Sequence, residues 1–252
     1  MNFLARLHAD LRGSRLTRRG ATHHPKDVPR GVHKEYPRML QVSLPEPEPL
    51  TTTLSDALLN RRSRSTGNPD MPVTLPEMGT LLGLSLRKHA PDVHHGRHYP
   101  SGGGLYPVET YFISTALESQ APAVFHYNPT THALERLWNL PPNFRMNDIA
   151  KRPENLSISG MLVFTGVWKR SSAKYGDLAY LHTLIEAGHM SENVLLSGCA
   201  MGLSMRPYAG FDDNLIISLL DLDEEQEQPV HTVTLCKNSQ QTTEESSPST
   251  EE

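Results

Sequence analysis

Three consecutive glycines directly before an apolar run are the feature that most restricts the fold of this chain. Gly102, Gly103 and Gly104 lack a Cβ, so the backbone there can adopt positive φ values and approach a flat or anionic ligand closely. Tyr, Val, Thr and Phe then occupy every second position from 106 to 112, and this alternation favours a half-buried β-strand. We therefore expect a ligand-binding loop that leads into a core strand. A surface loop without a ligand fits the composition equally well.

The length and composition are typical of one folded domain. The chain has 252 residues and a hydrophobic content of 37%, which suits a single good-sized core. No uninterrupted apolar run approaches the roughly 18 residues that a membrane helix needs, so we expect a soluble protein with no membrane partner. Cys199 and Cys236 offer neither a disulfide framework nor a CxxC metal site, which favours the cytoplasm. A net charge of −4 does not indicate nucleic-acid binding, and none is expected.

The charge is unevenly distributed between the two ends. Residues 1–40 contain nine Lys or Arg and three Asp or Glu, whereas residues 238–252 contain four Glu and no base. We expect a basic N-terminal arm over 1–45, a folded domain over 46–237 and an acidic, disordered tail over 238–252, because the tail has too few apolar residues to bury. The arm could hold a partner or an anionic peptide, and a solvated leader is the alternative.

Hydrophobic spacing and capping residues predict alternating helices and strands. A helix at 54–60 would follow the threonines at 51–53, and another at 75–86 would begin behind Thr74 and Pro76. A long helix is expected from Tyr180 to about Met201, with small residues that permit close packing of another helix. The other expected elements are strands at 124–129, 134–137, 161–167 and 230–235, a loop or edge segment at 202–211, and a short helix at 214–220 capped by Asp212. This alternation lacks a strict βαβ period, so an α+β fold is favoured.

A run of cations follows the first of these helices. Arg61, Arg62 and Arg64, together with the Ser63 hydroxyl, could bind a phosphate through paired N–H donors. A solvated basic turn is the alternative interpretation of the same four residues.

Histidines and carboxylates in two places raise the question of a metal site. His94, His95 and His98 lie in a loop with no carboxylate or thiolate arranged to complete a coordination sphere. Glu186 and His189 stand one helical turn apart, like half of a di-iron motif, but the second Glu-x-x-His that such a site requires does not occur. We expect an interface or core hydrogen-bonding pair at this position, and no metal.

Four short segments form a recognisable set when they are taken in chain order. They are Arg-Arg-Ser-Arg at 61–64, Tyr-Pro-Ser-Gly-Gly-Gly-Leu-Tyr-Pro at 99–107, Lys-Tyr-Gly at 174–176 with Tyr180, Glu-Ala-Gly-His at 186–189 and Asn193, and Gly-Leu at 202–203 with Pro207 and Gly-Phe-Asp at 210–212. Together they resemble the nitroreductase-like flavoprotein superfamily. The second and third segments resemble its azoline dehydrogenase branch, the microcin-type enzymes that make thiazoles and oxazoles in ribosomally made peptides. The resemblance covers residues 54–237.

The resemblance implies a fold and a cofactor. The fold is the nitroreductase-like α+β fold, in which helices flank a mostly antiparallel sheet, and FMN lies at the interface of a homodimer. The residues that the resemblance places at the flavin are Arg61, Arg62 and Ser63 at its phosphate with Lys237 as a distant helper, Pro100, Ser101, Gly102 and Gly103 along the isoalloxazine, Pro207 and Gly210 on the other side of the ring, and Asn193.

The resemblance also implies a reaction. Oxidation of a thiazoline or oxazoline to its aromatic form removes a hydride and a proton from adjacent carbons, so a base is needed beside the flavin. By resemblance, Lys174 and Tyr175 are the catalytic pair, one as the general base and the other as its orienting or proton-relay partner. The implied substrate is a precursor peptide, and the implied partner is a cyclodehydratase that first forms the azolines within a synthetase complex.

The chain departs from the family pattern at three positions. Leu178 and Leu181 stand where members commonly have Arg, and Cys236 stands where they have Gly. One alternative is therefore a general FMN-dependent nitro or quinone reductase that uses NAD(P)H and does not need Lys174 and Tyr175. Another is a non-catalytic flavin-fold scaffold of a peptide-modifying complex.

Overall fold

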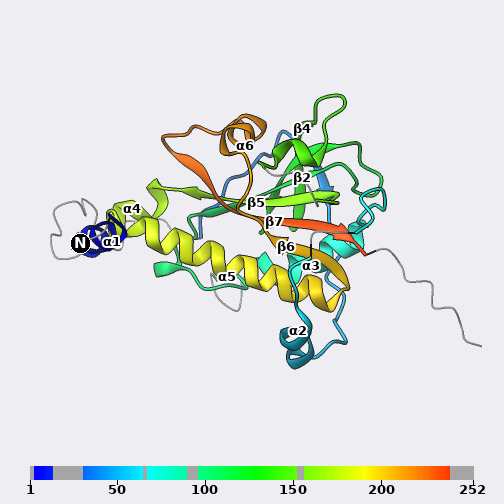
Figure 1. Cartoon of the computed structure of the whole chain (residues 1–252), viewed down its shortest axis with the longest axis horizontal. Helices are drawn as coiled ribbons and strands as arrows, with labels where there is room; N and C mark the ends of the chain where they lie inside the picture. Colours follow the sequence, from blue (N-terminus) through cyan, green and yellow to red (C-terminus); the bar gives the residue numbers. More distant parts are fainter. Residues whose placement is uncertain (1–2, 14–30, 65–66, 90–95, 152–155, 239–252) are drawn as a thin grey trace, which may run out of the picture.

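A computed structural model describes residues 3–13, 31–64, 67–89, 96–151 and 156–238. Within them, an antiparallel sheet of seven strands forms the centre of the molecule in the order β1-β4-β3-β2-β5-β7-β6 (Figure 1). The strands are β1 Leu40–Ser43, β2 Val108–Ser114, β3 Ala123–Asn128, β4 Ala133–Asn139, β5 Gly160–Val167, β6 Leu203–Pro207 and β7 Glu227–Lys237. The expectations for His94 and His95, for residues 1–2 and 14–30 of the basic arm, and for residues 239–252 of the acidic tail lie outside the described residues.

Helices cover both faces of this sheet, which confirms the α+β prediction (Figure 1). One face carries α3 and α5, and the other carries α6 and the short 3-10 helix η2. The helices are α1 Phe3–Gly13, α2 Leu54–Asn60, α3 Leu75–Leu86, α4 Lys169–Tyr175, α5 Leu178–Ala200 and α6 Asp213–Leu220, with the 3-10 helices η1 Gly102–Gly104 and η2 Met146–Ile149. In the part of the chain that the structure describes, no helix is both long enough and apolar enough to cross a membrane.

Three helices begin at the predicted capping residues. The side chain of Thr53 accepts a hydrogen bond from the Asp56 amide at the start of α2. Thr74 forms a reciprocal capping box with Glu77 at the start of α3, and Asp212 caps α6. Each such cap satisfies backbone N–H groups that have no partner inside the helix and contributes about 1 kcal/mol.

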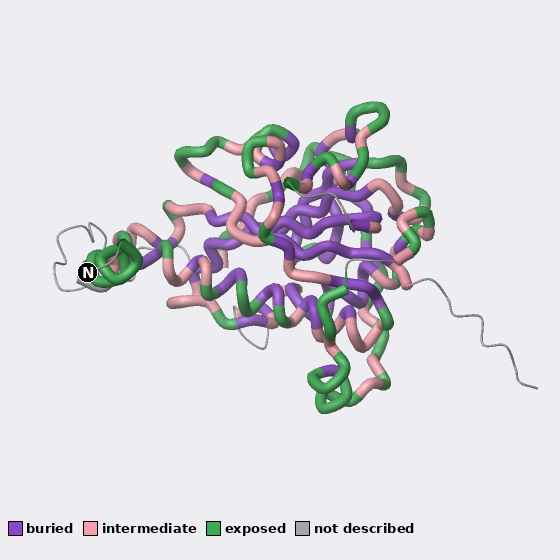
Figure 2. Tube along the Cα trace, in the orientation of Figure 1, coloured by how far each residue is buried: buried purple, intermediate pink, exposed green. Residues whose placement is uncertain are grey.

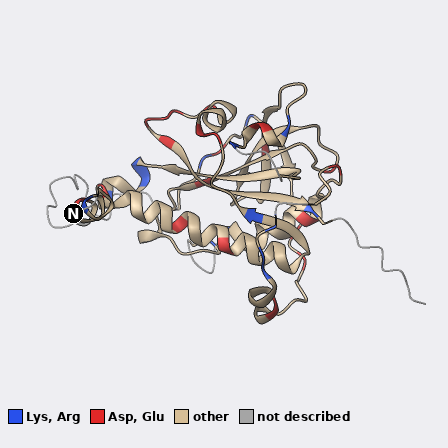
Figure 3. Cartoon of the chain, viewed as in Figure 1, with Lys and Arg blue, Asp and Glu red and all other residues tan. Residues whose placement is uncertain are grey.

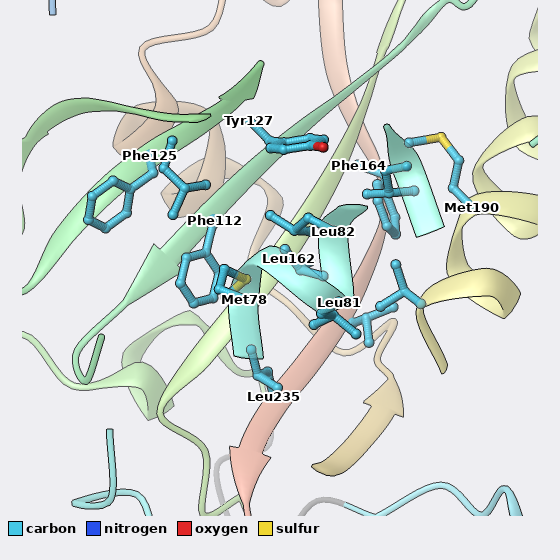
Figure 4. Packing of buried hydrophobic residues seen from close by; sticks show 14 of the residues in the cluster. Met78, Leu81, Leu82, Phe112, Phe125, Tyr127, Leu162, Phe164, Met190 and Leu235 are labelled. Carbon is cyan, nitrogen blue, oxygen red and sulfur yellow. The ribbon is translucent and has the colours of Figure 1, made fainter. Parts of the chain in front are cut away.

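The core is divided between the two faces of the sheet (Figure 2). On the first face, Met78, Leu81 and Leu82 of α3 pack against sheet residues such as Phe112 and Phe164 (Figure 4). All seven residues of β2 are buried, so the expectation of a half-buried strand was wrong. The reason is that both faces of β2 are covered, whereas alternation in sequence would suit a sheet with one face in water.

A separate short helix, α4, precedes α5, and the sequence analysis did not predict it. α4 ends at Tyr175, Gly176 takes a φ of 55°, and α5 begins at Leu178. Because a positive φ is unstrained only for glycine, Gly176 lets the chain turn sharply between the two helices. Lys174 and Tyr175 therefore lie in the last turn of a short helix, beside the N-terminal end of α5.

Candidate functional site

The glycine loop and the end of α4 meet in space. Gly103 has a φ of 68°, and a Cβ built on it would lie 2.6 Å from both Lys174 Nζ and Tyr175 Oη. Lys174 Nζ lies 5.0 Å from the centroid of the Tyr175 ring. The absence of a side chain at Gly103 thus makes room for both polar groups. Two motifs that are distant in sequence form one surface, made of exposed backbone, an amine and a phenol.

His182 of α5 is a third member of this group, and the sequence analysis missed it. Its ring lies 4.6 Å from the ring of Tyr175, centroid to centroid, with an interplanar angle of 80°. A Cβ on Gly102 would lie 3.1 Å from His182 Nδ1. The sequence did contain a signal that could have identified His182. It stands four residues before Glu186, and residues at this spacing lie on the same side of a helix.

Glu186, one turn after His182, places a buried carboxyl group beneath the loop. Its side chain is 2% exposed; Oε1 lies 3.4 Å from the Val108 amide, and Oε2 has no hydrogen-bond partner among the described residues. Burial raises the pKa of Glu186 to about 7, against the opposing effects of the Ser101 hydroxyl and the Arg97 charge. The carboxyl can therefore hold a proton near neutral pH, whereas His189 on the same helix is exposed.

Ser101 and its neighbours shape the loop from within. Ser101 Oγ accepts a hydrogen bond of 2.9 Å from the Tyr106 amide. Arg97 is buried below, with its guanidinium 4.7 Å from the Tyr106 ring and its Nη1 donating to the Tyr99 hydroxyl at 2.8 Å. Pro100 and Gly103 are exposed, so the loop presents backbone to the outside and keeps its hydroxyl and guanidinium inside.

The cationic run lies beside the other end of α5. Arg62 and Arg64 line a cavity of about 160 Å³ together with Cys199 and Gly202. The Arg64 amide donates to the Met205 carbonyl at 2.9 Å, which joins the run to β6. Both arginine side chains and Ser63 are exposed, and Arg61 is half-buried. Guanidinium groups at such a cavity can bind an anion.

The residues around the glycine loop and those around the arginine cavity are far apart within one chain. Cys199 follows His182 by 17 residues along α5, which at 1.5 Å per residue is about 25 Å. Figure 3 shows Lys and Arg on α4, at one end of α5, and again in the segment after α2, at its other end. Within one chain, the glycine loop and the arginine cavity therefore lie near opposite ends of α5.

The other residues expected at a flavin have partners inside the chain. Asn193 Nδ2 donates to the carbonyls of Ser85 and His98, which ties α5 to α3. Lys237 Nζ forms an ion pair with Glu77 Oε1 at 2.9 Å. Two further residues lie near the exit of β6, where Pro207 pairs with Val233 and the Gly210 carbonyl accepts from the Lys151 amide at 2.7 Å. Among the described residues, no group of three or more His, Cys, Asp or Glu could hold a metal ion.

Comparison with known proteins places this arrangement in context. Residues 58–236 match the nitroreductase family. A nitroreductase-like protein of Methanocaldococcus jannaschii is 26% identical over 186 residues, which are 73% of this chain and 91% of that protein. The microcin B17-processing protein McbC of Escherichia coli is 28% identical over 140 residues, which are 53% of this chain and 52% of that protein. The trifolitoxin-processing protein TfxB of Rhizobium leguminosarum is 23% identical, over 78% of this chain and 56% of that protein. The chain thus spans about half the length of both peptide-processing relatives.

Solved structures share the fold. The Escherichia coli microcin synthetase McbBCD complex with truncated pro-MccB17 bound contains a chain with a TM-score of 0.62 and 23% identity, and the overlap covers 71% of both chains. A nitroreductase-like protein of Exiguobacterium sibiricum in complex with FMN gives a TM-score of 0.53 at 13% identity, over 76% of this chain and 91% of that one. The expected nitroreductase-like fold is confirmed.

Proposed function

Because the chain belongs to the nitroreductase family, we propose that it is an FMN-dependent oxidoreductase that oxidises azoline rings in a ribosomally made peptide. Two curated relatives are processing proteins for microcin B17 and trifolitoxin, and one structural neighbour is part of a microcin synthetase with its precursor bound. These names support a peptide substrate. The contact of Lys174 and Tyr175 with Gly103 is the observation that carries the proposal.

The residues present fit FMN. Its phosphate is an anion, and the exposed guanidiniums of Arg62 and Arg64 at their cavity supply the matching donors. Its ring system is flat, and the loop at Gly102 and Gly103 offers backbone without side chains for a flat group to approach. When bound, FMN would accept the hydride that leaves the azoline ring.

The chain's own residues handle the proton in this scheme. Aromatisation removes a hydride from one ring carbon and a proton from its neighbour, so two electrons leave the ring as the hydride and a base takes the proton. Lys174 and Tyr175 are half-buried beside the exposed loop, which supports their assignment to this step. We assign one of them as the base and the other as its orienting or relay partner. The ring of His182 packs against Tyr175 and limits the orientations of the phenol.

A homodimer would complete the site. The arginine cavity and the glycine loop lie at opposite ends of α5, so a second copy has to bring one beside the other. The solvent side of α5 is partly apolar, with Ile185 56% exposed and Gly188 open, and α2 exposes Leu54, Leu58 and Leu59. Exposed apolar side chains on helices are typical of an interface. We infer that these faces pack against the same faces of a second copy.

The proposal also extends to a partner complex. An azoline is formed by loss of water from a Cys, Ser or Thr residue and the preceding amide, so a cyclodehydratase must act first. We propose that this enzyme and the chain work on the same precursor peptide in one complex, as the microcin synthetase neighbour suggests.

The test is a change in mass. The FMN-loaded protein is incubated with a precursor peptide that already carries azolines, and each oxidised ring loses about 2 Da, the two hydrogens removed with the hydride and the proton. We expect this loss with the parent protein and not with Lys174→Ala. A protein that leaves the peptide unchanged but oxidises NAD(P)H with a quinone or nitroaromatic would instead be a general reductase, the alternative that the family match supports. Purification without any flavin would favour a scaffold.

A further inference from the structure

A buried network of charges lies on the α6 face of the sheet, away from the residues assigned to proton transfer. His126 of β3 lies between two carboxylates, with Nε2 at 3.0 Å from Glu109 Oε2 and Nδ1 at 2.7 Å from Glu135 Oε2. All three side chains are almost fully buried. Burial alone would raise the pKa of Glu109, but the bond to His126 and the charge of Arg170 outweigh it and hold the pKa at about 2. Glu109 is therefore a fixed anion inside the protein.

Arg170 of α4 joins this network to the glycine loop. Its Nη2 forms an ion pair with Glu109 Oε1, and its Nη1 donates to the carbonyl of Tyr106 at 3.1 Å. Tyr106 has a φ of 49°, a conformation that is strained for a residue with a Cβ. One guanidinium thus holds both the strained end of the loop and the first turn of the helix that carries Lys174 and Tyr175.

The spacing on α4 gives Arg170 this position. Arg170 and Lys174 are four residues apart, so they lie on the same side of the helix, one turn from each other. Arg170 contacts the loop at Tyr106, and Lys174 contacts it at Gly103. The helix therefore meets the loop at two points, through the Arg170 hydrogen bond to the Tyr106 carbonyl at one end and through the proposed reactive pair at the other.

α4 is a short helix with little stability of its own, so contacts with other elements fix its position. It has seven residues, its first residue is preceded by Trp168 without a side-chain cap, and Ser171 is its one buried residue. A helix this short is unstable by itself in water, so its orientation depends on tertiary contacts. The side chain of Arg170 is 12% exposed, which makes its contacts well shielded from solvent.

Glu109 is itself held from a second direction. The Lys34 amide donates to Glu109 Oε1 at 2.6 Å, and the Gly31 amide donates to the Gly104 carbonyl at 3.2 Å. The segment 31–34 thus binds both the anion and the glycine loop. Arg170 therefore binds a carboxylate, Glu109, that the Lys34 amide and His126 also hold in place.

We propose that Arg170 is a positioning residue, which holds the Lys174 and Tyr175 pair against Gly103 by clamping α4 to Glu109 and the Tyr106 carbonyl. This inference rests on the proposed function for the role of the pair. The geometry that it controls is demanding, because a displacement of about 1 Å at reacting groups can reduce a rate 100-fold.

The experiment compares Arg170→Met and Arg170→Lys with the parent, all full-length and loaded with FMN. Lys169→Met is the matched control, because it removes an exposed cation from the same helical turn. Lys169 bonds Gln226 and does not contact the glycine loop. Two quantities are measured: hydrogen–deuterium exchange of the amides in 169–175, and kcat and KM for azoline oxidation.

For Arg170→Met we expect faster exchange in 169–175 with unchanged exchange in the second half of α5, and kcat roughly 10- to 100-fold lower at similar KM. Arg170→Lys should recover part of kcat, since an ammonium can bond Glu109 but cannot span both acceptors as a planar guanidinium does. Lys169→Met should match the parent in both measurements.

Unchanged exchange in 169–175 for Arg170→Met would overturn the proposal, and so would a loss of kcat equal to that of the control. If Arg170→Met does not fold, Arg170→Lys gives the same comparison. A parent protein that oxidises no azoline would contradict the proposed function alone, since the exchange measurement still decides whether Arg170 holds α4.

Discussion

At the residue scale, two neighbouring glycines separate the effect of backbone strain from the effect of a lost contact. Gly103 and Gly104 both have a φ of 68°, but a Cβ on Gly103 would lie 2.6 Å from Lys174 Nζ and Tyr175 Oη, whereas a Cβ on Gly104 has no atom within 4 Å. Alanine at either position should therefore destabilise the fold by about 1 kcal/mol through strain. Only alanine at Gly103 should displace the proposed reactive pair.

We predict that Gly103→Ala lowers kcat for azoline oxidation about tenfold or more, while Gly104→Ala retains most of the rate. Thermal unfolding of both variants checks that the strain is similar, and steady-state rates on an azoline peptide test the difference. Equal rates in the two variants would mean that the contact with Lys174 and Tyr175 is not needed for the reaction.

Glu186 gives a prediction for the pH dependence of stability. Burial raises its pKa from 4.5 to about 7, so the folded state binds this proton more tightly than the unfolded state does. The favourable contribution is complete below pH 4.5 and is lost as the pH rises through 7. Glu186→Gln lacks the titrating group. Its free energy of unfolding should therefore rise relative to that of the parent as the pH rises, by at most about 3 kcal/mol.

The measurement is the free energy of unfolding in urea between about pH 4.5 and pH 8. Glu192→Gln, an exposed position on the same helix, is the control and should follow the parent. A constant difference between Glu186→Gln and the parent across this range would contradict the assignment.

At the scale of elements, the register of three strands creates the buried charge network. β3 pairs antiparallel with β4 so that His126 lies opposite Glu135, and it pairs with β2 so that His126 lies opposite Tyr111. Glu109 stands two residues before Tyr111, on the same side of the sheet. A single sequence does not reveal this register, so neither the network nor the role of Arg170 could be predicted from it.

We predict a bell-shaped contribution of this network to stability. Burial lowers the pKa of His126, but its hydrogen bonds to Glu109 and Glu135 outweigh burial and raise it. Charged His126 therefore contributes fully to stability below pH 6.5, and this contribution is lost above its higher pKa in the folded state. Ionised Glu109 contributes fully above pH 4.5, and its contribution is lost as the pH falls towards 2. His126→Gln should cost about 3 kcal/mol or more between these limits, because it leaves two buried anions without their cation.

Urea unfolding at about pH 5.5 and pH 8.5 tests this expectation, with His189→Gln on the exposed side of α5 as the control. The cost of His126→Gln should be larger at the lower pH. An equal cost at both values would show that the charge on His126 does not contribute.

Local signals in the sequence were enough to predict most elements. Thr53, Thr74 and Asp212 cap helices where expected, because an N-cap acts on the next three residues only. The helix α4 was missed because Trp168 provides no capping side chain and the helix is only seven residues long. The burial of β2 was misjudged because it depends on helices that arrive from distant parts of the chain.

At the scale of the whole molecule, the separation of the two candidate half-sites along α5 predicts an oligomer. Ile185 lies on the exposed side of α5 with 56% of its surface accessible. Ile185→Glu should dissociate the proposed homodimer and reduce FMN retention, because a buried unpaired charge at the interface is unfavourable. Leu40→Glu, at an exposed position on β1 at the far edge of the sheet, is the matched control.

Sedimentation velocity and the flavin content after gel filtration report both effects. The control should remain dimeric with its flavin. A parent protein that is monomeric and still retains FMN would contradict the shared site.

The central claim is that Lys174 and Tyr175 act on an azoline beside FMN, and one measurement tests it most directly. The FMN-loaded protein is mixed with an azoline peptide in the absence of oxygen, and the visible absorbance of the oxidised flavin and the mass of the peptide are followed in the same sample. We predict that the absorbance falls as one ring per flavin loses its two hydrogens, and that Lys174→Ala, with FMN still bound, shows neither change. An absorbance that falls with NAD(P)H but not with the azoline peptide would contradict the account.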